Sequence, residues 1–171
     1  ESHEKVRNTG IEILEARPNP QETFQLMGFM SNQDYKDLPP HLQSKVLTTF
    51  QELDFNPKSE DSILDVAGNT QFGELPRGDQ YKILNVLEKA GTGLTNIDAL
   101  TSIFTTEAFY NQYQSSNPTE KSAILDQLEA GVEDRTFLKK FGEQLDGTFE
   151  ISAAEVRCAR KVFGCARAKR T

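Results

Sequence analysis

The sequence contains no tryptophan and has only two cysteines and two histidines in 171 residues. A zinc site built from cysteine and histidine needs about four such ligands at close spacing. His3 and His41 lie far along the chain from Cys158 and Cys165, and neither histidine neighbours a nucleophile motif. The composition therefore argues against a zinc site and against a Cys–His active centre.

Long hydrophobic runs are also missing. No stretch reaches the roughly 18 apolar residues that a membrane-spanning helix needs. A glycine-rich phosphate loop is absent too, because no lysine follows the run 91–93 and no predicted strand precedes it. We therefore expect no membrane span and no phosphate loop of this type.

Charge is distributed unevenly along the chain. The net charge is −7, but the segment from Val156 onward carries six basic residues and no acid, so the first 155 residues carry −13. An acidic body repels nucleic acid, and binding through the basic tail alone would be weak and steeply salt-dependent. Nucleic acid is therefore an unlikely partner. The basic residues of the tail are Arg157, Arg160, Lys161, Arg167, Lys169 and Arg170.

A recurring pattern of helix starts is the most informative feature. Proline occurs at 39, 76 and 118, with spacings of 37 and 42 residues, and apolar residues follow about 7, 8 and 11 positions after each proline. Proline suits the first turn of a helix, because its fixed φ is helical and its missing N–H has no partner to lose there. The later apolar positions form one stripe of a helix.

Each of these helices is followed by a second apolar-periodic segment, at 61–68, 95–113 and 134–145. The pattern predicts a single all-α domain, either a stack of about three helical-hairpin repeats or an irregular helical bundle. The expected hairpin units are 38–72, 75–113 and 117–145. A capping helix is expected at 19–35 and a basic C-terminal helix at 152–168, whereas 10–16 is compatible with a helix or a short strand.

The segment 144–155 resembles the calcium loop of the EF-hand family. Asp146, Thr148 and Glu155 occupy loop positions three, five and twelve, and the resemblance implies that they are ligands of Ca²⁺. The segment departs from the family pattern at Gln144, where the first aspartate belongs, and at Phe149, where glycine belongs. The same residues also fit an ordinary turn followed by a helix capped by Ser152 and Glu155.

Cys158 and Cys165 have two interpretations. If 152–168 is one helix, they lie on one face about 10 Å apart in rise, which is too far for a disulfide. If Gly164 ends the helix, the tail can fold back and bring the two thiols together. Both the disulfide and a pair of free thiols stay open.

Four aromatic residues cluster in the segment 95–113: Phe104, Phe109, Tyr110 and Tyr113. Aromatic side chains dominate binding hot spots, so an exposed ridge of this kind would be a partner-binding surface. The alternative is that these rings pack against the next helical unit.

These observations favour a non-enzymatic protein–protein interaction module whose partner is another protein. The acidic balance, the few cysteines and a first residue other than Met favour an exported bacterial protein or effector, and an extracellular location over the cytoplasm. One alternative is a helical domain that responds to a divalent cation through Asp146, Thr148 and Glu155. Another is an enzyme with a carboxylate-based site that the sequence does not reveal.

Overall fold

The computed structural model describes residues 3–16, 19–90 and 94–145. Every regular element in these ranges is a helix, which confirms the all-α prediction, and the ambiguous segment 10–16 is helical. The elements are α1 (His3–Ala16), α2 (Pro20–Ser31), α3 (Gln33–Lys36), α4 (Pro40–Glu52), α5 (Pro57–Ala67), α6 (Thr70–Gly73), α7 (Arg77–Lys89), α8 (Leu94–Phe104), α9 (Glu107–Ser115), α10 (Pro118–Ala130) and α11 (Arg135–Glu143).

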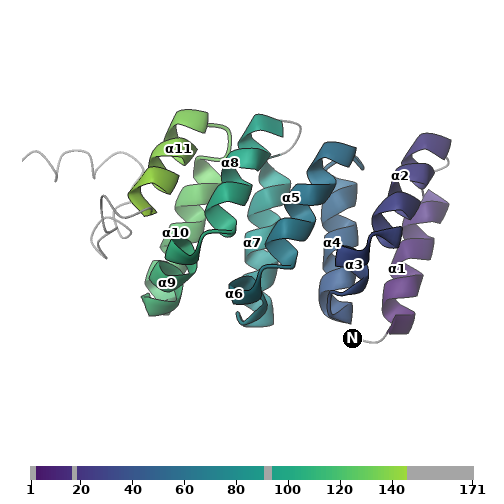
Figure 1. Cartoon of the computed structure of the whole chain (residues 1–171), viewed down its shortest axis with the longest axis horizontal. Helices are drawn as coiled ribbons and strands as arrows, with labels where there is room; N and C mark the ends of the chain where they lie inside the picture. Colours follow the sequence, from purple (N-terminus) through teal and green to yellow (C-terminus); the bar gives the residue numbers. More distant parts are fainter. Residues whose placement is uncertain (1–2, 17–18, 91–93, 146–171) are drawn as a thin grey trace, which may run out of the picture.

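The helices recur as groups of two longer helices and a shorter one. α4, α5 and α6 each begin 37 residues after α1, α2 and α3, and α7, α8 and α9 each begin 37 residues after those. α10 and α11 begin 41 residues after α7 and α8, because α9 has nine residues where α3 and α6 have four. Figure 1 shows the groups side by side, with α1, α4, α7 and α10 in one layer and α2, α5, α8 and α11 in the other.

The predicted two-helix unit is therefore incomplete, because it lacks the short third helix. The expected helix at 19–35 is two helices, α2 and α3, divided at Asn32, whose side chain accepts a hydrogen bond from the Asp34 N–H. The expected segment 95–113 is likewise divided into α8 and α9. An asparagine at the N-cap starts a new helix by satisfying a free N–H, which a pattern of apolar residues does not reveal.

The three helix starts marked by proline are confirmed. α4 and α7 begin directly after Pro39 and Pro76, and α10 begins with Pro118 at its first position. Asn117 caps α10 in a reciprocal capping box with Glu120. The first turn of each helix is thus set by local sequence.

A buried glutamine ties each of the first two short helices to the long helix that follows it. Gln43 Nε2 donates to the carbonyl oxygens of Tyr35 and Lys36, both at 3.2 Å. Thirty-seven residues later, Gln80 Nε2 donates to the carbonyl oxygens of Phe72 and Gly73 at 3.1 and 3.3 Å. The Tyr35 and Phe72 carbonyl oxygens also accept from the N–H groups of Leu38 and Leu75. The amides therefore add a donor at the end of each short helix, where the last carbonyls have no partner within the helix.

Polar contacts also join α4 to α7. Glu88 Oε1 lies 2.9 Å from Lys45 Nζ and accepts a 2.8 Å hydrogen bond from Thr49 Oγ1. His41 Nε2 and Gln80 Oε1 are 2.9 Å apart. The second and third groups are therefore held in register by polar pairs beside the apolar contacts.

The apolar core runs through the whole described stack. Within it, the rings of Phe29 and Phe50 stack with centroids 4.5 Å apart, which joins α2 to α4. Core burial at about 25 cal/mol per Å² of apolar surface is the main favourable contribution to folding.

Tyr35 carries a polar hydroxyl at a buried position where the later helix groups have phenylalanine. The equivalent residues one and two periods later are Phe72 and Phe109, and all three side chains are buried. The Tyr35 hydroxyl has no hydrogen-bond partner among the described residues, and burial raises its pKa to about 12. A buried polar group without a partner costs about 1–3 kcal/mol.

We expect Tyr35→Phe to raise the free energy of unfolding by about 1 kcal/mol, because it removes the unpaired hydroxyl and keeps the ring. Urea denaturation followed by circular dichroism measures the change. Tyr110→Phe is the matched control and should destabilise the fold, since the Tyr110 hydroxyl donates to the Phe104 carbonyl at 2.6 Å. A loss of stability in Tyr35→Phe would contradict this interpretation.

Candidate functional site

The predicted aromatic ridge is not exposed. Phe104, Phe109, Tyr110 and Tyr113 are each no more than 1% exposed. Phe109 contacts the other three rings at centroid distances of 5.1–5.7 Å, and the Tyr113 hydroxyl donates to Asp79 Oδ1 at 3.0 Å. These four residues therefore build the core between α7, α8 and α9, and the partner surface has to be sought elsewhere.

The other predicted site residues lie outside the described part of the chain. These are Asp146, Thr148 and Glu155 of the EF-hand-like segment and the pair Cys158 and Cys165, together with the expected helix at 152–168. Within the described ranges, no three His, Cys, Asp or Glu side chains are grouped so that they could hold a metal ion. None of the helices in those ranges is long and apolar enough to cross a membrane.

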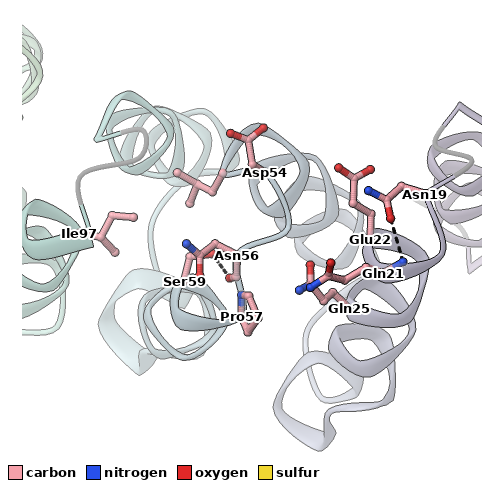
Figure 2. A pocket seen from close by; sticks show the side chains of 10 residues that line it. Asn19, Gln21, Glu22, Gln25, Asp54, Asn56, Pro57, Ser59 and Ile97 are labelled. Carbon is pink, nitrogen blue, oxygen red and sulfur yellow. Dashed lines mark hydrogen bonds between the residues drawn. The ribbon is translucent and has the colours of Figure 1, made fainter.

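A cleft of about 350 Å³ opens between α2 and the start of α5. Figure 2 shows Gln21, Glu22 and Gln25 of α2 on one side and Asn56 and Pro57 on the other. A second hollow, beside His3, Glu4 and Arg7, is lined by one turn of α1 alone and has no opposite wall. The α2–α5 cleft is lined by Asn19, Gln21, Glu22, Gln25, Leu53, Asp54, Asn56, Pro57, Ser59 and Ile97.

Side-chain size explains why the cleft opens at this point of the stack. α5 packs closely along α8, and α8 along α11, whereas α2 makes only slight contact with α5. Glu22 and Gln25 of α2 hold the positions that Ser59 and Ser62 hold one period later, and both serines are buried. Short side chains allow two helices to approach, while the long side chains of α2 keep α5 at a distance.

The walls of the cleft are rich in amides. Asn19 and Asn56 lie one period apart and cap α2 and α5, each accepting a 3.0 Å hydrogen bond from the backbone N–H two residues on. The side-chain amides of Gln21 and Gln25 make no hydrogen bond to the described residues. An amide offers both a donor and an acceptor, as a peptide group does. The cleft thus presents hydrogen-bonding groups of both kinds, and none of the lysine and arginine residues in the described ranges lines it.

A strained turn forms one wall of the cleft. Asp54 and Phe55 adopt the left-handed conformation, with φ of 55° and 54°. The Phe55 N–H donates to the Phe50 carbonyl and the Asp54 N–H to the Gln51 carbonyl, both at 3.0 Å. This is a Schellman motif, in which the ring contact between Phe55 and Phe50 supplies the usual apolar pair.

Glycine normally takes the left-handed position of such a motif, because a side chain there costs about 1–2 kcal/mol. The sequence has Gly91 one period after Asp54. The turn at the cleft therefore has aspartate at the position where the sequence has glycine one period later. Backbone strain of this kind gathers at functional sites, where the surrounding packing maintains it.

Sequence reasoning missed this cleft for an identifiable reason. The 37-residue alignment of Glu22 with Ser59 and of Gln25 with Ser62 was available in the sequence, as was Asp54 in place of glycine. Whether these residues line a cleft depends on the distance between α2 and α5, and no local sequence pattern specifies that distance.

No protein-family model, no curated protein and no solved structure matches this chain.

We expect Asp54→Gly to raise the free energy of unfolding by about 1 kcal/mol, because glycine adopts a positive φ without steric cost. Thermal or urea denaturation measures this. Asp126→Gly, at an exposed position inside α10, is the control and should lower stability by roughly 0.3–0.5 kcal/mol. Equal losses in both variants would show that the left-handed turn stores no strain.

A cluster of carboxylates beside the junction of α3 and α5 makes the stability of the fold depend on pH. Partial desolvation raises the pKa of Asp65, and the carboxylates of Asp61 and Asp34 raise it further. Ionised Asp65 therefore opposes folding at neutral pH, and this penalty disappears once the pH falls below the pKa of the unfolded chain.

We expect Asp65→Asn to be slightly more stable than the parent protein at pH 7, with the difference vanishing near pH 3, because Asp65 is protonated there in both states. Urea midpoints of the two proteins across this pH range test the prediction. A difference that grows as the pH falls would reverse the sign that we assign.

Proposed function

We propose that this chain is a non-enzymatic protein-interaction module that holds an extended segment of a partner protein in the α2–α5 cleft. The observation that carries the proposal is the cleft itself. It opens between α2 and α5, whereas the equivalent helices later in the stack, α5 with α8 and α8 with α11, pack closely. The exported context predicted from composition stays a prediction.

The chemistry of the walls supports a peptide ligand. An extended segment presents N–H and C=O groups alternately along its edge, and the amides of Gln21 and Gln25 match either group. Leu53 and Ile97, both apolar, also line the cleft, but they are only 4% and 1% exposed, so most of the surface offered to a ligand is polar. The ligand would gain its affinity from main-chain hydrogen bonds to the exposed amides.

Preorganisation supports the same proposal. Phe55, in the strained turn, is buried at 1% exposure, and Ser59 beside the cleft is fully buried, with its hydroxyl donating to the Asn56 carbonyl at 2.7 Å. A wall fixed by packing loses little conformational entropy when it binds a ligand.

The double variant Glu22→Ser with Gln25→Ser tests the function, because it installs the residues found one period later and should let α2 close on α5. The probe is an array of synthetic peptides of varied sequence, read with labelled protein. We expect the parent protein to bind a reproducible subset and the double variant to lose at least tenfold in affinity, without loss of thermal stability.

Glu107→Ser with Gln114→Ser is the matched control, because it removes the same two side chains from exposed positions of α9. It should retain the binding pattern of the parent protein. Binding that persists equally in the cleft variant and in the α9 variant would exclude the cleft as the site, and an array without reproducible binding would refute the proposed function.

A further inference from the structure

Two carboxylates line the α2–α5 cleft, one on each wall. Glu22 lies in the first turn of α2, and Asp54 lies in the left-handed turn between α4 and α5. In Figure 2 both side chains lie along the upper edge of the cleft, with the amides of Gln21 and Gln25 below Glu22. None of the described lysine and arginine residues lines the cleft, so this edge carries negative charge without a cation beside it.

The fold does not use the carboxylate of Glu22. The same four-residue start, Asn-Pro-x-Glu, opens both α2 and α10. In α10, the Glu120 side chain accepts from the Asn117 N–H at 3.3 Å and from its side-chain amide at 3.0 Å, which completes a capping box. Glu22 makes no such bond to Asn19 and has no hydrogen bond or ion pair to a described residue. Its carboxylate lines the cleft instead.

The carboxylate of Asp54 is not used by the fold either. It has no hydrogen bond or ion pair to a described residue, and the turn itself is closed by backbone hydrogen bonds. Two ionised groups in one cleft repel one another, and a ligand with a positive charge removes this repulsion as it binds. The walls are therefore complementary in charge to a cation.

We propose that the partner segment held in the cleft carries a lysine or arginine side chain, which binds between Glu22 and Asp54. The proposal rests on the proposed function, because it names the residue that the same cleft selects. A cleft of about 350 Å³ lies at the small end of ligand sites and has room for one or two residues of a peptide. The cationic side chain would make charge-assisted hydrogen bonds to the two carboxylates, and the main chain beside it would meet the amides of Gln21 and Gln25.

A metal ion fits the cleft less well. Calcium takes six to eight oxygen ligands. Within the described ranges, no three His, Cys, Asp or Glu side chains are grouped so that they could hold an ion. An ammonium or guanidinium group on a flexible stem has three to five N–H donors, and two carboxylates with neighbouring amide oxygens are suited to accept them.

The test uses pairs of peptides that differ at one position. Each peptide that binds the parent protein in the array is remade with glutamine in place of one lysine or arginine, which keeps a long polar side chain and removes the charge. Fluorescence anisotropy with the full chain at low salt gives the dissociation constants. We expect the basic member to bind at least about fivefold more tightly, the effect of one or two partly exposed ion pairs. Array binders without a basic residue would overturn the proposal.

Glu22→Gln with Asp54→Asn shows whether these two charges make the selection. The variant keeps the size of both side chains, and asparagine tolerates the left-handed turn, so the thermal midpoint should stay close to that of the parent. It should bind both members of each pair equally. Asp126→Asn with Glu129→Gln changes the net charge by the same amount at exposed positions of α10, and should keep the preference of the parent. Equal loss of preference in both variants would overturn the proposal, because net charge alone would then select the peptide.

A second readout locates the contact. Carbodiimide joins the amine of a bound lysine peptide to a carboxylate beside it, and mass spectrometry should find the peptide on Glu22 or Asp54. Coupling only to other carboxylates would overturn the proposal. If basic and glutamine peptides bind the parent equally, and Glu22→Ser with Gln25→Ser still abolishes binding, the peptide-binding function stands and the preference for a basic residue is refuted. If no peptide binds, both are refuted.

Discussion

The first two junctions of the stack depend on buried amides that join one group of helices to the next. Gln43 and Gln80 are 7% and 3% exposed, and each binds two carbonyl oxygens at the end of the short helix that precedes it. Without these bonds, the carbonyl oxygens of Lys36 and Gly73 would lose the donor that the buried amide supplies, whereas those of Tyr35 and Phe72 would keep a backbone N–H. The repeated bond also fixes the direction in which the chain leaves each short helix, so the next long helix begins beside the previous one.

α2 is the helix at which this regular arrangement changes. On the side toward α5, Glu22 and Gln25 replace small residues and leave a polar cleft. On the other side, Phe24 and Met27 are exposed, whereas the later groups carry Asp61, Asp98 and Lys139 at the position of Phe24, and the buried Leu64 follows one period after Met27. The two surfaces differ in chemistry and lie on opposite sides of one helix.

Two residues that differ from their equivalents 37 positions later lower the stability of the fold. Tyr35 carries a hydroxyl without a partner where phenylalanine occurs twice later, and Asp54 takes a left-handed conformation that suits glycine. Each departure costs about 1 kcal/mol or more, which is a sizeable part of the total stability of a small domain. Asp54 lies in the wall of the cleft, so its strain coincides with the candidate site.

The sequence by itself determined the helical class, the three helix starts at proline and the spacing of the long helices. These features arise from interactions within a few residues: proline geometry, an asparagine cap and an apolar stripe. A stripe tells which side chains share a face, but not what lies opposite that face. The pattern therefore left open whether Phe104, Phe109, Tyr110 and Tyr113 form an exposed ridge or part of the core, and only packing between α7, α8 and α9 decided for the core. The cleft was likewise decided by tertiary structure, because its width depends on side chains of α2 and on a helix 37 residues away.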